Sequence, residues 1–290
     1  MKTTVFTGAC GLAGAAALNG LSPYVLPEKL DFDPNRSYWA NALPPPNPPL
    51  QKNIDIDIAV IGGGLSGLST AYFLKKDHGI NSRVVLLEAL RCGNGASGRN
   101  GAMMLTSTAD RYMQWSGHPD LDKRIHDLTA ENVRKVKQLS RSFGMDTEIE
   151  QNGALQVCNT MEDAEVARKY VEKAQSANLS CEFWDKGRVV EALGTEAYEG
   201  ALFDPDSGQV HPGKLVGLFK AAAESVGVEI FEQTAVMHLE EGKQLTLTTA
   251  GGQTVRAGSL VLATNAYSSS LDFFDGPRHQ FLIMLESLAR

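Results

Sequence analysis

Two short and mostly apolar runs, residues 56–61 and 84–87, stand out in the hydrophobic pattern of this chain. Apolar runs of about four to eight residues, bounded by glycine or polar residues, are typical of buried strands. Between them, residues 66–76 place apolar side chains at helical spacing, and a polar turn follows at 77–81. The pattern predicts a strand, a helix and a second strand that runs parallel to the first.

The rest of the chain carries further helical and strand patterns. Residues 121–143 repeat apolar side chains at helical spacing with charged residues between them, which predicts an amphipathic helix. Further helices are expected at 162–178 and 212–226, and strands at 153–159, 199–210 and 228–231. Residues 239–255 alternate as in an antiparallel meander, and 259–263 is typical of a buried strand. This mixture of elements indicates an α/β fold.

Three glycines, Gly62, Gly64 and Gly67, have the spacing G-x-G-x-x-G where the first strand becomes the helix. Gly62 permits a tight turn, Gly64 lets backbone N–H groups approach a diphosphate, and Gly67 lets the helix lie close to the sheet. Glu88 follows about 20 residues later, at the end of the second strand. Because a carboxylate there can accept hydrogen bonds from ribose hydroxyls, the spacing indicates a dinucleotide site.

The N-terminus of the first helix belongs to the same predicted site. Leu65 and Ser66 open the helix, where N–H groups without partners and the positive end of the helix dipole favour an anion. A glycine-rich turn in an ordinary α/β sheet is the alternative interpretation. The motif alone does not distinguish FAD from NAD.

A glycine-rich segment, ALRCGNGASGRNGAMM at 89–104, follows Glu88 directly. The small residues between Gly95 and Gly101 allow the backbone to run close to a planar ligand. Arg99 and Asn100 are its two functional side chains of note. A solvated glycine loop is the alternative, but the position after the acidic residue favours a cofactor contact.

Composition narrows the class of protein. The chain has 290 residues, of which 43% are hydrophobic and 21% charged, which is typical of a globular protein long enough for two domains. The formal net charge of −7 argues against nucleic acid as a partner. The four cysteines have neither C-x-x-C nor metal-ligand spacing, so we expect neither a metal site nor disulfides.

The N-terminal region precedes the predicted fold. Residues 1–26 contain a weakly apolar run at 5–18, which suits either the central part of a signal peptide or a loosely packed arm. The run resembles the inner part of a twin-arginine signal whose arginine pair would lie upstream of Met1. The protein is therefore expected to be cytoplasmic, or exported to the periplasm if this segment is a signal.

Residues 27–53 are predicted to form a linker. They include PPPNPP at 44–49, and proline fixes φ and removes backbone donors, which favours an extended spacer over regular secondary structure. We therefore expect the folded part of the chain to begin near Ile54. A proline-rich ligand for a partner domain is the alternative.

Several motifs together resemble the FAD-dependent D-amino-acid oxidase superfamily, the branch with glycine, sarcosine and γ-glutamylputrescine oxidases. The resemblance rests on DIAVIGGGLSGLSTAYFL at 57–74, on Glu88 and above all on GASGRNGAMM at 95–104. Two later segments, 209–236 and 260–269, agree with it. It implies a Rossmann-like FAD-binding domain with a βαβ unit of the glutathione reductase type, together with a second, mixed-sheet substrate domain.

The resemblance also implies a division of the chain. The FAD-binding domain would be discontinuous, at 54–145 and 211–270, and the substrate domain would comprise 146–210 and 271–290. The last third of a typical member would follow Arg290, so we expect the chain to be truncated at its C-terminus and its substrate domain to be incomplete. His211 is expected to have a structural role, because Pro212 beside it marks a helix start.

Individual cofactor contacts are implied residue by residue. By the resemblance, Ser97 would meet phosphate, and Arg99, Asn100 and Gly101 would lie near the isoalloxazine. The remaining implied contacts are Ala89 beside the acidic residue, Val236 at the adenine, and Ala263 and Thr264 at the end of the last strand. Relatives commonly have glycine where this chain has Ala102, and that difference could shift the approach to the flavin.

The loop that follows Glu88 also indicates whether the flavin is attached covalently. Some relatives hold the flavin covalently through a histidine, and none stands between Glu88 and Met104. We therefore expect FAD to bind non-covalently.

The implied function is oxidation of a C–N bond in an amine or amino acid by hydride transfer to the flavin. No protein acid or base is required, so no catalytic residue is predicted. A flavin dehydrogenase that passes electrons to an acceptor other than oxygen is the first alternative, and an inactive nucleotide-binding remnant is the second. An NAD-binding protein is a weaker interpretation, since GASGRNG would then be unexplained. The sequence leaves the substrate, the electron acceptor and the oligomeric state open.

Overall fold

The computed structural model describes residues 37–77, 81–106 and 119–270. Its described residues fall into two compact units, the first drawn from 1–100 and 212–290 and the second being 101–211. The sequence prediction places the first break at 145, whereas residues 101–106 and 119–145 group with the second unit.

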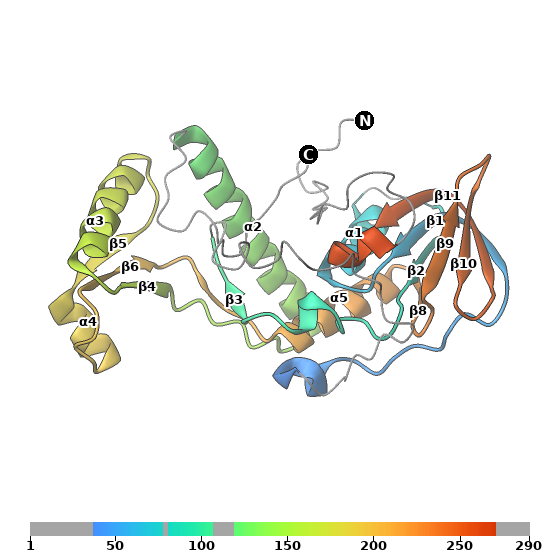
Figure 1. Cartoon of the computed structure of the whole chain (residues 1–290), viewed down its shortest axis with the longest axis horizontal. Helices are drawn as coiled ribbons and strands as arrows, with labels where there is room; N and C mark the ends of the chain where they lie inside the picture. Colours follow the sequence, from blue (N-terminus) through green and yellow to red (C-terminus); the bar gives the residue numbers. More distant parts are fainter. Residues whose placement is uncertain (1–36, 78–80, 107–118, 271–290) are drawn as a thin grey trace, which may run out of the picture. The chain divides into compact units, whose positions relative to one another are not determined.

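The first unit is built on a six-stranded mixed sheet in the order β8-β2-β1-β11-β10-β9 (Figure 1). The first four strands in this order are parallel, and β10 pairs antiparallel with both β11 and β9. Their bounds are Ile54–Ile61 for β1, Val84–Leu87 for β2, Glu229–Phe231 for β8, Val236–Glu240 for β9, Leu245–Thr249 for β10 and Thr254–Leu262 for β11. The predicted α/β fold class is confirmed.

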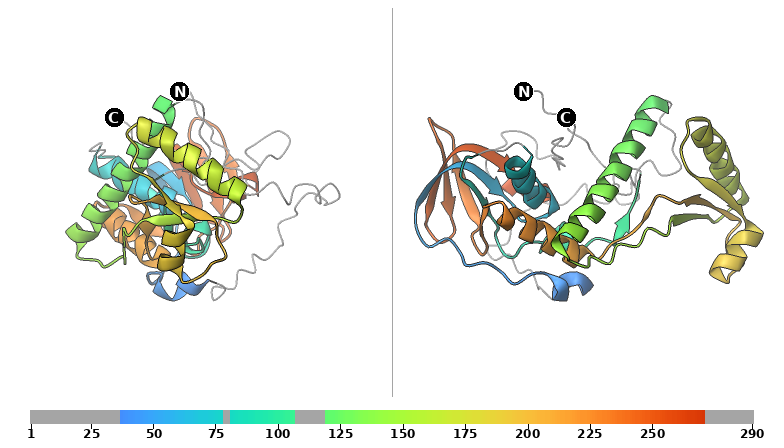
Figure 2. Two further views of the ribbon diagram at one scale, coloured as in Figure 1. Left: turned by 90° about the vertical axis from the view of Figure 1, so that its left-hand side faces the viewer. Right: turned by 180° about the vertical axis from the view of Figure 1, so that it is seen from behind.

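Two helices, α1 (Leu65–Lys76) and α5 (Pro212–Ser225), pack against each other beside this sheet (Figure 2). Their buried faces include small residues, among them Ala71 on α1 and Gly217 on α5, which permit a close approach of the two backbones. Strand β2 is fully buried and all four of its residues are Val or Leu, as expected for a parallel strand that is covered on both faces.

Residues 37–50 belong to the first unit and are not a spacer. A 3-10 helix, η3, covers Tyr38–Ala42, and the Ser37 hydroxyl accepts a hydrogen bond from the Trp39 N–H at its start. Leu43 and Leu50 are buried in the unit. The prediction that no secondary structure precedes Ile54 is therefore wrong for this segment. The predicted signal or arm at 1–26 lies outside the described residues.

The second unit contains a three-stranded antiparallel sheet in the order β4-β6-β5, formed by β4 (Ala154–Cys158), β6 (Gly200–Asp204) and β5 (Glu182–Asp185). A separate pair joins β3 (Met103–Met104) to β7 (Gly208–Gln209). The helices are α2 (Pro119–Phe143), α3 (Met161–Ser176) and α4 (Lys186–Leu193).

Helix α3 supplies the core of this unit. Ala167, Val171 and Ala174 are buried in one cluster with Leu202 of β6. The helix begins with a capping box, in which Thr160 accepts a hydrogen bond from the Asp163 N–H and Asp163 accepts one from the Thr160 N–H. Both features were readable in the sequence as helical spacing with a polar start.

The strand predicted at 199–210 is broken into β6 and β7. Pro205 cannot donate to a ladder, and Asp204 accepts a hydrogen bond from the Asp206 N–H through its own side chain, which forms a turn. Strand β5 and helix α4 were not predicted, because both are too short for a clear periodic signal.

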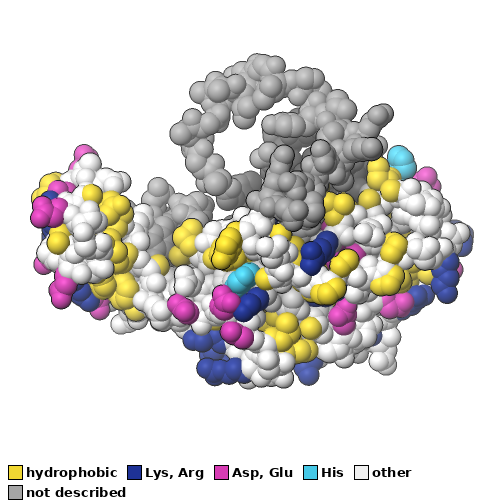
Figure 3. Space-filling model, turned by 90° about the horizontal axis from the view of Figure 1, so that it is seen from below, with side chains coloured by type: hydrophobic (Ala, Val, Ile, Leu, Met, Phe, Trp, Pro, Cys, Tyr) yellow, Lys and Arg dark blue, Asp and Glu magenta, His cyan; other side chains and the backbone are white. Residues whose placement is uncertain are grey.

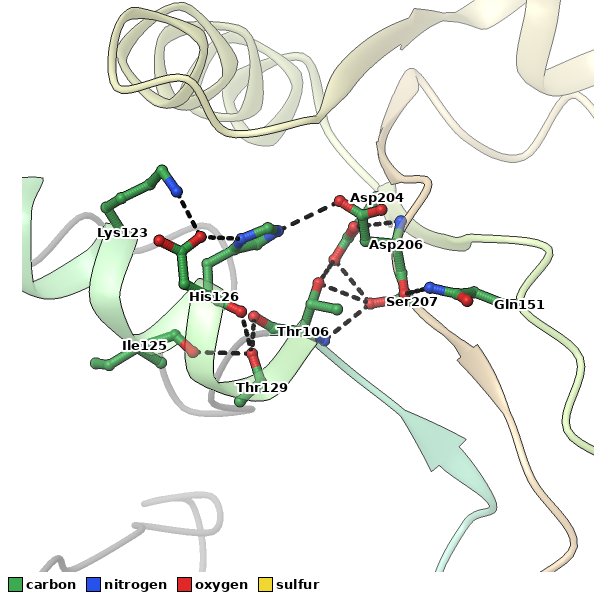
Figure 4. A network of polar contacts seen from close by, with 10 residues as sticks. Thr106, Lys123, Ile125, His126, Thr129, Gln151, Asp204, Asp206 and Ser207 are labelled. Atoms are coloured by element: carbon green, nitrogen blue, oxygen red, sulfur yellow. Dashed lines mark hydrogen bonds and ion pairs between the residues drawn. The ribbon is translucent and has the colours of Figure 1, made fainter. Parts of the chain in front are cut away.

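A buried polar cluster stabilises the turn after β6 (Figure 4). The Asp204 carboxylate accepts hydrogen bonds from the Thr106 and Ser207 hydroxyls, each at 2.7 Å. The Thr129 hydroxyl of α2 donates to the Thr106 carbonyl, which ties that helix to the cluster. Because Asp204 has all of these donors within its own unit, the cluster has a structural role.

The surface combines both signs of charge. On the face shown in Figure 3, acidic and basic side chains are interspersed with apolar ones. Within the described residues, no helix has the length and hydropathy needed to cross a lipid bilayer.

We predict that Ala102→Gly stabilises the protein. Ala102 has φ of 63°, in the left-handed region, where a Cβ is unfavourable and glycine is not. Relief of this strain stabilises the folded protein, and the larger conformational entropy of glycine in the unfolded chain partly offsets the gain. The free energy of unfolding, measured by urea denaturation, should therefore rise by about 0.5–1 kcal/mol. The matched control, Ala130→Gly within α2, should lower it by about 1 kcal/mol. Equal destabilisation by both changes would contradict the assigned backbone conformation.

Candidate functional site

The turn between β1 and α1 has no room for side chains at two of its three predicted glycines and little room at the third. Gly62 has φ of +108°, and a Cβ there would lie 2.5 Å from the Ala263 carbonyl oxygen. A Cβ on Gly67 would lie 1.9 Å from the Gly62 carbonyl oxygen. At Gly64, which caps the helix in an extended conformation, a Cβ would meet the Ser97 hydroxyl at 2.9 Å. The turn is therefore bare backbone that faces the start of the helix.

The N-terminus of α1 presents backbone donors at this turn. The Leu65 N–H donates to the Ser97 hydroxyl at 2.9 Å, so the structure brings these two predicted residues together. The next amides, of Ser66 and Gly67, lie in the first turn of the helix and have no carbonyl within the helix to which they can bond. With the helix dipole, this end of α1 is suited to bind an anion.

Glu88 lies beside the same turn. One of its carboxylate oxygens accepts from the Gly63 N–H at 2.6 Å and the other accepts from the Leu90 N–H at 2.9 Å. Burial raises the pKa of the Glu88 carboxyl above its ordinary value, and the bonds from Leu90, Gly63 and Ala89 oppose that shift. The main chain thus fixes the orientation of the carboxylate and leaves each oxygen with a further lone pair for a hydroxyl donor.

The predicted residues after Ser97 are tied into their own loop. The Arg99 guanidinium donates to the Asn94 carbonyl, and the Asn100 side chain donates to the Ser97 carbonyl at 2.9 Å. A Cβ on Gly98 would lie 2.3 Å from the Gly93 carbonyl oxygen, so the loop is folded tightly on itself. The predicted contacts of Arg99 and Asn100 with the flavin stay predictions.

Four further predicted residues lie outside the glycine turn and the loop that follows Glu88 up to Asn100. Ala263 and Thr264 follow β11, and the Ala263 N–H donates to the Ile61 carbonyl, which places them at the glycine turn. Val236 opens β9 and packs against the core of the sheet. Gly101 is the first residue of the second unit, and its predicted contact with the flavin stays a prediction.

The sequence interpretation missed a buried ion pair behind this site. Glu232, which is fully buried, forms an ion pair with Lys220 of α5, whose side chain is 4% exposed. Glu232 also accepts a hydrogen bond from the Cys92 N–H at 2.6 Å, next to the Glu88 strand end. The sequence signal that could have revealed the ion pair is Lys220 itself, which lies on the apolar face of an alanine-rich helix. A buried lysine requires an acidic partner.

The residues present fit a dinucleotide such as FAD. The glycine turn is a cradle that a single Cβ at Gly64 would fill, the first amides of α1 point at it, and the oriented Glu88 carboxylate lies next to it. Among residues 37–77, 81–106 and 119–270, no group of three or more His, Cys, Asp or Glu side chains is arranged to hold a metal ion.

Comparison with known proteins identifies the family. The model of the DAO family, described as FAD dependent oxidoreductase, matches residues 57–287. The chain belongs to this family of FAD-dependent oxidoreductases. The family and its cofactor agree with the sequence prediction.

Individual relatives are similar over about half of their length. The chain is 30% identical over 227 residues to the probable oxidoreductase OrdL of Haemophilus influenzae. The aligned region covers 76% of this chain and 51% of the relative. The chain is 28% identical over 220 residues to gamma-glutamylputrescine oxidoreductase of Escherichia coli, with 75% and 51% covered. The chain thus spans about half the length of the curated relatives it matches.

A solved member of the family has the same fold. The crystal structure of glycine oxidase from Geobacillus kaustophilus superposes with a TM-score of 0.64 at 25% identity. The match covers 75% of this chain and 57% of that chain. The mixed α/β architecture predicted from the sequence is therefore confirmed.

We predict that alanine destabilises the protein much less at Gly64 than at Gly67, although both glycines belong to the turn. At Gly64 the new methyl meets only the end of the Ser97 side chain, so the free energy of unfolding should fall by less than about 1 kcal/mol. At Gly67 it meets the Gly62 backbone, so Gly67→Ala should cost about 2–3 kcal/mol or more. Because Gly64→Ala fills the cradle, it should weaken FAD binding about tenfold or more. Urea denaturation and calorimetric titration with FAD measure the two effects, and equal destabilisation would contradict this geometry.

Proposed function

We propose that this protein oxidises a C–N bond of an amine or amino acid by hydride transfer to FAD. The observation that carries the proposal is the glycine turn with the oriented Glu88 carboxylate beside it. Family membership supports it, as do the names of two relatives, gamma-glutamylputrescine oxidoreductase and glycine oxidase.

Residues of the first unit would bind the diphosphate and the ribose of the cofactor. The amides of Ser66 and Gly67 would donate to the diphosphate, and Glu88 would accept hydrogen bonds from the ribose hydroxyls. Ser97, which already accepts from the Leu65 N–H, would lie at the edge of the diphosphate. We accordingly propose the first unit as the FAD-binding domain and the second as part of the substrate domain.

The chemistry would come from the cofactor. When bound, FAD accepts a hydride from the carbon next to a neutral amine. The protein contributes binding and orientation, and removal of the hydride from a neutral amine requires no protein acid or base. We therefore assign no catalytic residue in this chain.

Purified protein tests the proposal directly. The 290-residue chain is titrated with FAD and then mixed without oxygen with glycine, sarcosine or γ-glutamylputrescine. We expect stoichiometric FAD binding and loss of the oxidised flavin's visible absorption with at least one of these amines. Glycolate, which replaces the nitrogen of glycine by oxygen, is the control and should leave the absorption unchanged.

The outcomes separate the alternatives. Recovery of the absorption on admitting air indicates an oxidase, whereas recovery only with a quinone or dye indicates a dehydrogenase. A chain that takes up no FAD would contradict the proposal and would favour an inactive remnant.

A further inference from the structure

Residues 37–50, here called the strap, lie along the loop 91–100 within the first unit. The Ser37 hydroxyl donates to the Gly98 carbonyl at 2.7 Å, and the Trp39 indole N–H donates to the Asn100 carbonyl at 2.9 Å. The Arg91 guanidinium donates in the opposite direction, to the carbonyls of Leu43 and Pro44. The strap and the loop are therefore joined at both ends of the loop.

Apolar packing makes the same connection. A Cβ on Gly93 would lie 2.6 Å from the Leu43 side chain, and one on Gly98 would lie 3.3 Å from it. Leu43 is itself buried, so it fills the space that these two glycines leave open. Two of the loop's glycines thus have a packing partner in the strap.

The buried ion pair of Lys220 and Glu232 also forms hydrogen bonds with the strap. Lys220 donates both to Glu232 and to the Pro45 carbonyl, the latter at 2.8 Å. Glu232 accepts from the Asn47 N–H of the strap and from the Cys92 N–H of the loop. One carboxylate therefore joins the strap to the beginning of the loop, and the Leu50 N–H donates to Thr234 two residues further on.

We propose that the strap is part of the cofactor site and that Ser37 and Trp39 are positioning residues for the segment 97–100. They act through the loop backbone, because both donate to its carbonyl oxygens and leave the Ser97 side chain on the Leu65 N–H. The inference deepens the proposed function, on which it rests. It assigns a role in flavin binding to residues that precede the first strand of the dinucleotide fold.

The two halves of the cofactor should respond differently. Glu88 is held by the amides of Gly63 and Leu90, which the strap bonds at Ser37 and Trp39 do not touch. The nucleotide half should therefore bind equally well without these two bonds. By the family resemblance the segment that follows Ser97 would lie at the flavin half, so binding of that half should weaken.

The test uses the full chain with Ser37→Ala and Trp39→Phe, alone and combined. Both side chains are partly exposed, and each change keeps most of the packing, so these variants should fold. Trp39→Phe removes one donor, and Ser37→Ala removes the donor to Gly98 together with the acceptor of the Trp39 N–H. Calorimetry measures the affinities for FAD and for ADP, and hydrogen exchange follows the amides of residues 91–100 in the cofactor-free protein. Tyr38→Phe, at a side chain 83% exposed, is the matched control.

The inference predicts that each single change weakens FAD binding about three- to tenfold and leaves ADP binding unchanged. It also predicts faster exchange in 97–100 and no effect of Tyr38→Phe. Unchanged FAD affinity in the double variant, or an equal loss of FAD and ADP affinity, would overturn it. Failure of the unaltered chain to bind FAD would instead overturn the proposed function, so the two failures are distinguishable.

Discussion

The structure of the first unit depends on the absence of a Cβ at Gly62 and Gly67, two of the three glycines of the turn. Both positions face backbone oxygens within 2.5 Å of where a Cβ would lie, so β1, α1 and the end of β11 can meet only because glycine occupies them. The same constraint exposes the first amides of α1 at the end of the parallel strands. In an open α/β sheet, that end is where ligands bind, so a packing requirement of the fold produces an anion site.

A second constraint is the buried ion pair behind this turn. Burying Lys220 and Glu232 carries a desolvation cost that is offset only if their remaining hydrogen-bonding groups are satisfied. The strap and the loop provide those partners, through the Pro45 carbonyl and through the N–H groups of Asn47 and Cys92. The ion pair thus holds three segments that are distant in sequence in one arrangement. That arrangement supports the loop at the site.

The sequence predicted the elements that have strong local signals and missed those defined by distant partners. The strand, helix and strand around the glycine turn were predicted to within two residues at each boundary, because apolar runs, helical spacing and glycine spacing all agree there. Glu88 and Ser97, predicted as cofactor contacts by spacing and by the family resemblance respectively, bond to the amides of Gly63 and Leu65 at this turn, and their contacts with the cofactor stay predictions. The strap was interpreted as a spacer because its prolines show no periodicity, and its order comes from Lys220 and Glu232, more than 170 residues away. The predicted division at 145 differs from the grouping of helix α2 with the second unit, because amphipathicity alone does not show which unit a helix covers.

The central claim is that bare backbone at the start of α1 holds the diphosphate while Glu88 holds the adjoining ribose. A crystal structure of the chain with FAD, or with ADP as its nucleotide half, tests this most directly. The account predicts phosphate oxygens within hydrogen-bond distance, about 2.7–3.2 Å, of the first amides of α1 and ribose hydroxyls on the Glu88 carboxylate. A nucleotide bound elsewhere on the molecule, with Glu88 still bonded only to the Gly63 and Leu90 amides, would contradict it.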